Sequence, residues 1–572
     1  MAGQSRKWMI VVATTWIQAF TGTNFDFSSY SSDLKSVLGI SQVQLNYLSV
    51  ASDMGKAFGW CSGVSLMYFP LWAVMFMAAA LGLLAYGLQW LVIQRVIAVP
   101  YFLMFVLCLL AGCSICWFNT VCFVLCLRNF SVNRALALSL TISFNGLTAA
   151  LYNLIVSAIN SSNDALYLLL NALVPLFTSS IALIPVLRQP PPQQLSPDTI
   201  RQDSRIFLCL NVIAVGTGLY VLLINHLSGN LFRGRLFLGG AIFLLVLPLG
   251  LPGIVYARKW TRQLIGASRL CLKLNWSSFN LVDPDDLQLQ KELLGREETN
   301  SNRLPMNENS GRTRLSSRWH IEGCCAIMEK DALTVLGEEH PARLLLRRLD
   351  FWLYYLAYLC GGTIGLVYSN NIGQISQSLG FGEQTSAIVT LYSSCSFFGR
   401  LFSAAPDFLR NKVYFARTGW FAIALIPTPI AFCLLSASGS ISALRAGTAL
   451  IGLSSGFTFS AAVSITSELF GPNSAGVNHN ILITNIPIGS LLYGLLAALV
   501  YDQNADQSSG RTQIMSLFSD SMVCMGRKCY FQSFIWWGCI SMVGLLCSVL
   551  LFLRTKPAYD QFEGNRIRTE SS

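Results

Sequence analysis

Residues Leu71–Ile93 read LWAVMFMAAALGLLAYGLQWLVI, an apolar stretch that contains no charged side chain. A helix of that length is about 34 Å long, enough to cross a hydrocarbon core of about 30 Å. The whole chain is 53% hydrophobic and 12% charged, whereas soluble domains are about 25% charged. Because charged side chains are costly in lipid, this composition predicts a membrane protein.

Thirteen further apolar stretches of about 20 residues lie on either side of this one. Six of the fourteen precede a proline-rich connector, two follow it, and six come after a long polar segment. The predicted spans are Trp8–Ser29, Gln42–Leu66, Leu71–Ile93, Tyr101–Leu127, Arg134–Ile159, Ala165–Leu187, Ile206–Asn225, Leu236–Tyr256, Phe351–Tyr368, Ser386–Ala404, Tyr414–Leu435, Ile441–Val463, Asn478–Tyr501 and Phe531–Leu553. The fold class is therefore an all-α polytopic membrane protein.

These spans divide the chain into five parts. The predicted domains are an N-terminal six-helix half (1–188), a linker with two extra membrane helices (189–257), a loop whose polar composition favours disorder (258–348), a C-terminal six-helix half (349–555) and a tail (556–572).

Lysine and arginine gather in the loops on the side of the two termini, which predicts that both termini and the long loop are cytosolic. Asn160, in Asn160-Ser161-Ser162, then faces outward as a candidate glycosylation acceptor. Tyr559–Phe562 fits a tyrosine-based sorting signal or is an ordinary part of the tail. We therefore expect the plasma membrane or an endomembrane.

Several function classes lack their signatures. The sequence contains no HExxH, GxSxG, Walker or GxGxxG motif and no matched CxxC pairs, so we expect no enzyme, no cofactor and no metal. The net charge of +11 resides in loops without interleaved stacking aromatics, so we expect no nucleic acid. The expected partners are the lipid bilayer and a small solute, with the chain a monomer. Cys524 and Cys529 share a polar loop and would form a disulfide if it faces an oxidising lumen.

The two halves share an internal repeat. Gly22 and Gly59 are 37 positions apart, as are Gly362 and Gly399. The pattern Phe-x-x-Asn opens the fifth span of each half, at 130–133 and 470–473. A duplicated six-helix unit around a central site is a transporter architecture.

The stretch Gly399–Lys412 resembles the loop between the second and third helices of a half in the major facilitator superfamily. The resemblance implies that Arg400, Asp407 and Arg410 form a conformational latch. Ser403 stands where that family usually has glycine, and Cys61–Pro70 in the first half carries no charge. The latch is therefore expected in the second half alone.

The chain more closely resembles the plant nodulin-like branch of this superfamily, which contains the nuclear-fusion-defective proteins. The matching motifs are Asn46–Gly63, Gly87–Trp90, Asp350–Tyr355, Ser467–Gly471, Leu499–Asp502 and Cys524–Cys529. Two of them are also similar to oxalate–formate and monocarboxylate carriers, which implies small carboxylates as a substrate class. Against this, we find no cation deep in the second or fifth helix of the second half.

Ionisable residues inside spans are functional candidates. Asp53 and Lys56 share one helix face; they are either a packing pair or a pair broken and remade during transport. Asp26, beside Asn24, is either a proton acceptor or a hydrated acid at the rim. Arg128 and Arg134 are anchors at the membrane surface or gate residues that pair with acids such as Glu468. Six neutral polar residues are expected either to line a central cavity or to form hydrogen bonds between helices: Asn119, Asn145, Tyr152, Tyr368, Asn370 and Asn485.

These features favour a secondary carrier of a small solute that works by alternating access, with or without proton coupling. Two other classes stay open, because a fold does not fix a function. One is a receptor that binds without transport, and the other is a membrane-organising protein that acts through its long loop.

Overall fold

The computed structural model describes residues 3–130, 133–159, 165–188, 197–224, 231–254, 333, 335–409, 414–471, 474–509 and 524–571. All regular elements in these ranges are helices. Asn160, Arg410 and most of the predicted loop 258–348 lie outside the described residues.

The N-terminal half contains six helical passes, three of them broken into shorter helices. Its elements are α1 (Gly3–Thr21), η1 (Thr23–Asp26), α2 (Phe27–Leu38), α3 (Gln42–Ala57), α4 (Trp60–Tyr68), α5 (Leu71–Ile93), α6 (Tyr101–Asn129), α7 (Arg134–Gly146), α8 (Thr148–Ile159) and α9 (Leu166–Leu187). The first pass is interrupted at Gly22, where a Cβ would lie 2.4 Å from Asn145 O. A side chain would therefore force α1 and α7 apart.

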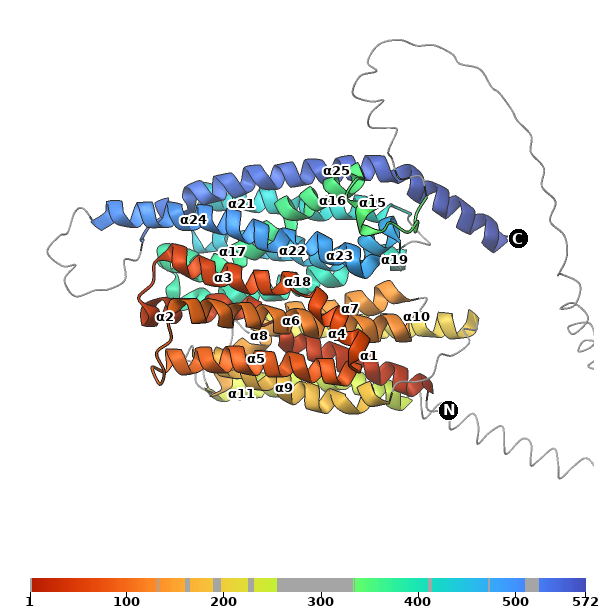
Figure 1. Cartoon of the computed structure of the whole chain (residues 1–572), viewed down its shortest axis with the longest axis horizontal. Coiled ribbons are helices and arrows are strands. Elements are labelled where there is room, and N and C mark those ends of the chain that lie inside the picture. Colours follow the sequence, from red (N-terminus) through yellow and green to blue (C-terminus); the bar gives the residue numbers. More distant parts are fainter. Residues whose placement is uncertain are drawn as a thin grey trace, which may run out of the picture. The chain divides into compact units, whose positions relative to one another are not determined.

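The C-terminal half also contains six passes. Its elements are α15 (Ala342–Leu345), α16 (Leu349–Tyr358), the π-helical turn η4 (Leu359–Thr363), α17 (Ile364–Ser378), η5 (Gly382–Gln384), α18 (Thr385–Phe402), α19 (Ala405–Leu409), α20 (Arg417–Leu425), α21 (Pro427–Ala437), α22 (Ile441–Phe470), α23 (Ala475–Ile483), α24 (Asn485–Ser509) and α25 (Lys528–Ser571). The start of α1 and the end of α25 lie at the same end of the helix bundle (Figure 1), which we call the terminal end. The opposite end is the far end.

Two linking helices, α10 (Pro197–Ile224) and α11 (Leu231–Val246), complete the fourteen predicted passes. α11 packs on α8, and α10 packs on α18 and α11. Two side chains connect them to α1: Lys7 pairs with Asp203 at 2.5 Å, and Trp16 Nε1 donates to Leu245 O at 2.7 Å. Eleven passes in the described chain are long and apolar enough to cross a membrane. The other three, Gly3–Leu38, Gln42–Tyr68 and Thr385–Phe402, are broken or richer in polar residues. The protein is thus an integral multi-pass membrane protein.

The repeat predicted from the sequence is present, with a corrected alignment. A Cβ on Gly55 would lie 2.1 Å from Leu109 O, and one on Gly399 would lie 2.1 Å from Leu453 O. Both pairs of equivalent positions are 344 residues apart. In each half, glycine thus lets the second helix pack tightly on the fourth. The counterpart of Gly399 is therefore Gly55, one helical turn before the predicted Gly59.

Two predicted segments differ in the structure. The last part of the predicted disordered loop packs on the C-terminal half, where Gly337 N donates to Glu468 O at 2.8 Å and His340 N to Phe470 O at 3.1 Å. The predicted sorting signal lies inside α25, and Tyr559 is buried, with its hydroxyl bonded to Glu468 at 2.8 Å. A tyrosine-based sorting signal is bound as an extended, exposed peptide. Because Tyr559 is buried and helical, it is unsuited to that role.

Candidate substrate site between the halves

Between α2 and α17, the two halves are joined at the far end by neutral side chains. Gln374 Nε2 donates to Ser31 Oγ at 3.0 Å, and Gln377 Nε2 donates to Ser32 Oγ at 2.7 Å. Gly373 allows this approach, because a Cβ there would lie 2.6 Å from Ser28 O. We call these contacts between α2 and α17 the far-end seam.

The hydrogen bonds between the halves continue to the middle of the bundle. Asn370 Nδ2 donates to Ser49 Oγ at 2.7 Å, and Asn153 Nδ2 donates to Thr390 Oγ1 at 3.0 Å. Arg400 is the last residue in this series, and no hydrogen bond between described residues joins the halves on its terminal side. The halves are therefore closed together at the far end.

Arg400 lies about 22 Å along α18 from the far end and is 5% exposed. Its guanidinium Nη1 donates to Ile142 O and to Asn145 Oδ1 of the other half, each at 3.2 Å. It also lies over the rings of Phe25 and Phe459, at 5.2 and 5.6 Å from their centroids. Arg400 is thus held by elements of both halves, and no acidic side chain of the described chain pairs with it.

Two hydrogen-bond donors at this position have no partner. Arg400 Nε and Asn145 Nδ2 are both buried without an acceptor among the described residues. The amide of Asn145 is oriented by its own bond, since Oδ1 accepts from the guanidinium. Buried donors normally have acceptors, so this cluster offers donors and positive charge to a ligand that supplies acceptors.

Arg400 corrects two expectations from the sequence. It is a cation deep in the second helix of the second half, where we expected none. It also forms no pair with Asp407, the acid of the predicted latch, which pairs with Arg417 instead: Arg417 Nη2 bonds to Asp407 at 2.6 Å and Nε to Glu468 at 2.9 Å. Arg417 is the first residue of α20, at the terminal end, and was not among the predicted site residues. It lies far from both acids along the chain, so no sequence motif indicated that it would pair with them.

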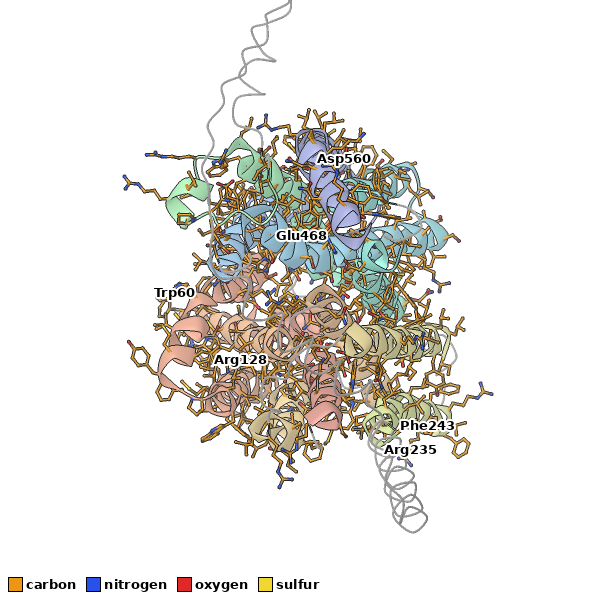
Figure 2. The ribbon with its side chains drawn as sticks, turned by 90° about the vertical axis from the view of Figure 1, so that its right-hand side faces the viewer. Trp60, Arg128, Arg235, Phe243, Glu468 and Asp560 are labelled. Atoms are coloured by element: carbon orange, nitrogen blue, oxygen red, sulfur yellow. A yellow bond between two sulfur atoms is a disulfide. The ribbon has the colours of Figure 1, made fainter. Side chains whose placement is uncertain are left out.

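The two predicted gate arginines lie elsewhere. Arg128 and Arg134 are exposed, and the cation paired with Glu468 is Arg417. Figure 2, which views the terminal end, shows Arg128 and Glu468 on separate halves. Their positions fit the predicted role of membrane-surface anchors.

Lys56 in α3 and Arg400 in α18 are equivalent residues of the internal repeat, 344 positions apart. Here the structure forms the predicted pair, with Lys56 Nζ 2.6 Å from Asp53 Oδ1. Asp53 Oδ2 also accepts a hydrogen bond from Ser490 of the other half. The pair therefore lies at the contact between α3 and α24.

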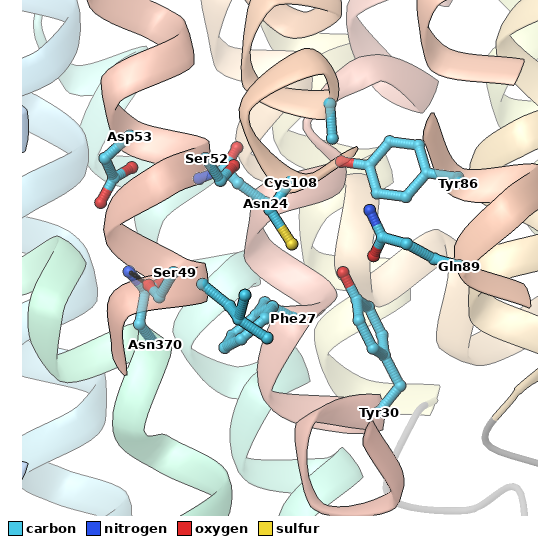
Figure 3. A pocket seen from close by; sticks show the side chains of 12 residues that line it. Asn24, Phe27, Tyr30, Ser49, Ser52, Asp53, Tyr86, Gln89, Cys108 and Asn370 are labelled. Carbon is cyan, nitrogen blue, oxygen red and sulfur yellow. Dashed lines mark hydrogen bonds between the residues drawn. The ribbon is translucent and has the colours of Figure 1, made fainter. Parts of the chain in front are cut away.

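Asp26 is fully buried, so the reading as a hydrated acid at the rim is wrong. Its Oδ1 accepts from Asn171 Nδ2 at 3.2 Å, and its Oδ2 has no partner among the described residues. Asn24, in η1, lines a small pocket together with Asp53 and Asn370 (Figure 3).

Four predicted cavity residues bond helix to helix inside one half. Asn119 accepts from Gln18, Tyr152 donates to Phe20 O, Tyr368 bonds to Thr448, and Asn485 accepts from Thr363, at 2.7 to 3.1 Å. Only Asn145 and Asn370 of the six predicted neutral residues bond across the halves. Cys524 and Cys529 form a disulfide, and Gly526 N holds their loop to Ser378 O at the end of α17.

Comparisons with known proteins agree with this architecture. Residues 7–253 match the Nodulin-like family model, and residues 334–560 match the model of the NFD4 C-terminal domain. The chain is 55% identical to the protein NUCLEAR FUSION DEFECTIVE 4 of Arabidopsis thaliana, covering 100% of this chain and 93% of that protein. The name of that relative mentions no substrate.

Two solved transporters share the fold at low identity. A bacterial homologue of the human lysosomal transporter Spinster matches with a TM-score of 0.50 at 9% identity, covering 97% of this chain and 98% of its own. A peptide transporter in complex with alafosfalin matches with a TM-score of 0.50 at 11% identity, covering 96% and 94%. These two likenesses concern the fold alone.

Proposed function

Because this chain belongs to the nodulin-like family and has a transporter fold, we propose that it is a secondary carrier of a small organic anion. The anion binds at Arg400, between the halves, and crosses the membrane as the halves rock about it.

The observation that carries this proposal is the uncompensated charge of Arg400. A guanidinium buried without a counter-ion is costly, and here the surrounding protein offers only neutral acceptors and aromatic rings. A bound anion supplies the missing negative charge and the missing acceptors for Arg400 Nε and Asn145 Nδ2.

The geometry also favours a carboxylate. The planar guanidinium fork matches the two oxygens of a carboxylate, and hydrogen bonds of this kind are the stronger ones in proteins. Residues of α7 belong to one half and Arg400 to the other, so one bound carboxylate touches both moving bodies. This arrangement links binding to the relative position of the halves.

The lysine and arginine bias predicts that the terminal end lies in the cytosol. With the far-end seam closed, the described arrangement is then the cytosol-facing stage of the cycle. Opening of the far-end seam exposes Arg400 to the other side of the membrane.

Ligand-induced stabilisation of the purified full-length protein tests this function. The probes are formate, oxalate, lactate and pyruvate, with the uncharged lactamide as the control for lactate. An anion at about 100 times its dissociation constant adds about 2.7 kcal/mol to the free energy of unfolding. We expect at least one anion to raise the unfolding temperature and lactamide to leave it unchanged.

Arg400→Gln removes the charge and is expected to abolish this shift, with a loss of affinity of about 100-fold. Arg400→Lys keeps the charge without the fork and loses about tenfold. Arg128→Gln is the matched control at an exposed arginine and binds as the wild type does. Equal binding by Arg400→Gln and the wild type would refute the assignment of the site.

A further inference from the structure

Arg400 differs from the other buried arginines of the described chain, because each of those is bonded to an acid. The pairs are Arg417–Asp407, Arg417–Glu468 and Arg554–Asp350. A solute that binds at Arg400 therefore meets one uncompensated positive charge. A second carboxylate on the solute would be buried without a partner, which is costly. The charge balance at this site thus favours a solute with a single negative charge.

The polar groups without partners at Arg400 match one carboxylate. Arg400 Nε and Asn145 Nδ2 have no acceptor among the described residues, and Ser396 Oγ, one helical turn earlier on α18, has no partner there either. A carboxylate has two oxygens with about four lone-pair sites. A single carboxylate can therefore satisfy all three groups.

Aromatic rings surround this polar group. Besides the rings of Phe25 and Phe459, which contact the guanidinium, a second layer consists of two tyrosines. The ring centroids of Phe25 and Tyr392 are 6.3 Å apart, and those of Phe459 and Tyr358 are 5.7 Å apart. These rings come from η1, α16, α18 and α22, so both halves contribute. A flat apolar group attached to the carboxylate would meet ring faces and edges.

Two aromatic pairs near Arg400 join one half to the other. Phe25 packs on Tyr392, and Phe144 packs on Phe397 with ring centroids 5.6 Å apart. When the halves move apart here, these rings lose their partners and become exposed to water, which is unfavourable. A ring carried by the solute covers the separated rings and offsets that cost. The apolar part of the solute then assists the movement of the halves as well as binding.

We propose that the transported solute is a monocarboxylate with an aromatic body, which binds with its carboxylate at Arg400 and its ring beside Phe25 and Phe459. This inference rests on the carrier function proposed above, for which it names the substrate class. Arg400 selects the single charge, and the two phenylalanines, one from each half, select the ring.

Benzene carboxylates and formate test this class on the purified full-length protein. The rise of the unfolding temperature with ligand concentration gives each dissociation constant. Benzoate is formate with a phenyl ring in place of hydrogen, and we expect it to bind about 30-fold more tightly. Terephthalate resembles para-toluate but carries a second carboxylate in place of the methyl group, so it should bind about 100-fold more weakly than para-toluate. The uncharged benzamide should leave the unfolding temperature unchanged.

Ring variants then test the place of the aromatic body. Phe459→Leu keeps an apolar side chain without the ring, so the preference for benzoate over formate should fall about fivefold. Phe25→Leu gives the same measurement from the other half if the first variant does not fold. Phe402→Leu, at an exposed ring of α18, is the matched control and keeps the wild-type preference.

Three results would overturn the inference: formate that binds as tightly as benzoate, terephthalate that binds as tightly as para-toluate, or a benzoate preference unchanged in both ring variants. If binding is still lost in Arg400→Gln in these cases, the substrate class fails and the anion carrier stands. If no anion raises the unfolding temperature of the wild type, both proposals fail.

Discussion

Lys56 and Arg400 are equivalent residues of the two halves, yet only one of them has a counter-ion. Each follows the glycine that packs the second helix of its half against the fourth. Lys56 pairs with Asp53, three residues earlier, at 2.6 Å. The equivalent of Asp53 in the second half is Phe397, whose ring packs on Phe144 of the other half.

The difference shows how a duplicated helix pair can be used in two ways. In the first half the cation is neutralised within its own helix, and the pair joins α3 to α24. In the second half the cation is more deeply buried, and its Nε has no acceptor among the described residues. The asymmetry places the free positive charge at one point between the halves, where a single anion can bind.

Phe397→Asp should have the largest effect on anion binding, because it gives Arg400 an acidic partner like the one that Lys56 has. A carboxylate three residues before Arg400 lies on the same helix face and competes with the solute anion. We expect the affinity for the stabilising anion to fall about 30-fold, or about 2 kcal/mol. Thermal unfolding with and without the anion measures this loss.

Phe397→Leu is the matched control, since it also removes the ring and adds no charge. Anion binding that is equally weak in both variants would mean that lost packing, and not the new carboxylate, is responsible.

Asp53→Asn tests the pair that Lys56 forms in the first half. It leaves the partly buried Lys56 with a neutral partner, which should lower the free energy of unfolding by about 1.5 kcal/mol. Because Arg400 is a separate site, the affinity for the anion should stay within about threefold. Denaturation of the ligand-free protein gives the first quantity, and titration with the anion gives the second.

Glu383→Gln, at an exposed acid, should leave both quantities unchanged. A large loss of anion affinity in Asp53→Asn would place the substrate at the Lys56 pair and contradict the role given to Arg400.

Gln377→Ala should have the smallest effect, since it removes one neutral hydrogen bond from the far-end seam. The closed state should lose about 0.7 kcal/mol, which shifts the equilibrium between closed and open seams about threefold. The alkylation rate of Ser49→Cys, which lies in the closed contact with Asn370, reports this shift. An unchanged rate would show that the bond contributes nothing to closure.

The sequence predicted the fold well because apolar length and spacing decide where helices cross a membrane. It also predicted the pair Asp53–Lys56, since three residues along one helix fix a short distance. It failed at Arg400, which stands near the predicted end of its span and matched a loop motif. The burial of Arg400 depends on Phe25, Asn145 and Phe459, from three distant helices, and spacing within one helix does not reveal such neighbours.

Reversible cross-linking of the halves tests alternating access most directly. Ser49→Cys and Asn370→Cys, whose native side chains bond at 2.7 Å, are joined in proteoliposomes by a short bis-methanethiosulfonate, which forms a reducible disulfide with each thiol. The protein carries Cys209→Ser, Cys433→Ser and Cys539→Ser, which remove the exposed free thiols among the described residues, and the same protein without the pair is treated in parallel. The account predicts that flux of the carbon-14-labelled anion identified by stabilisation stops on cross-linking and returns on reduction, while binding at Arg400 persists. Undiminished flux through the cross-linked protein would contradict it.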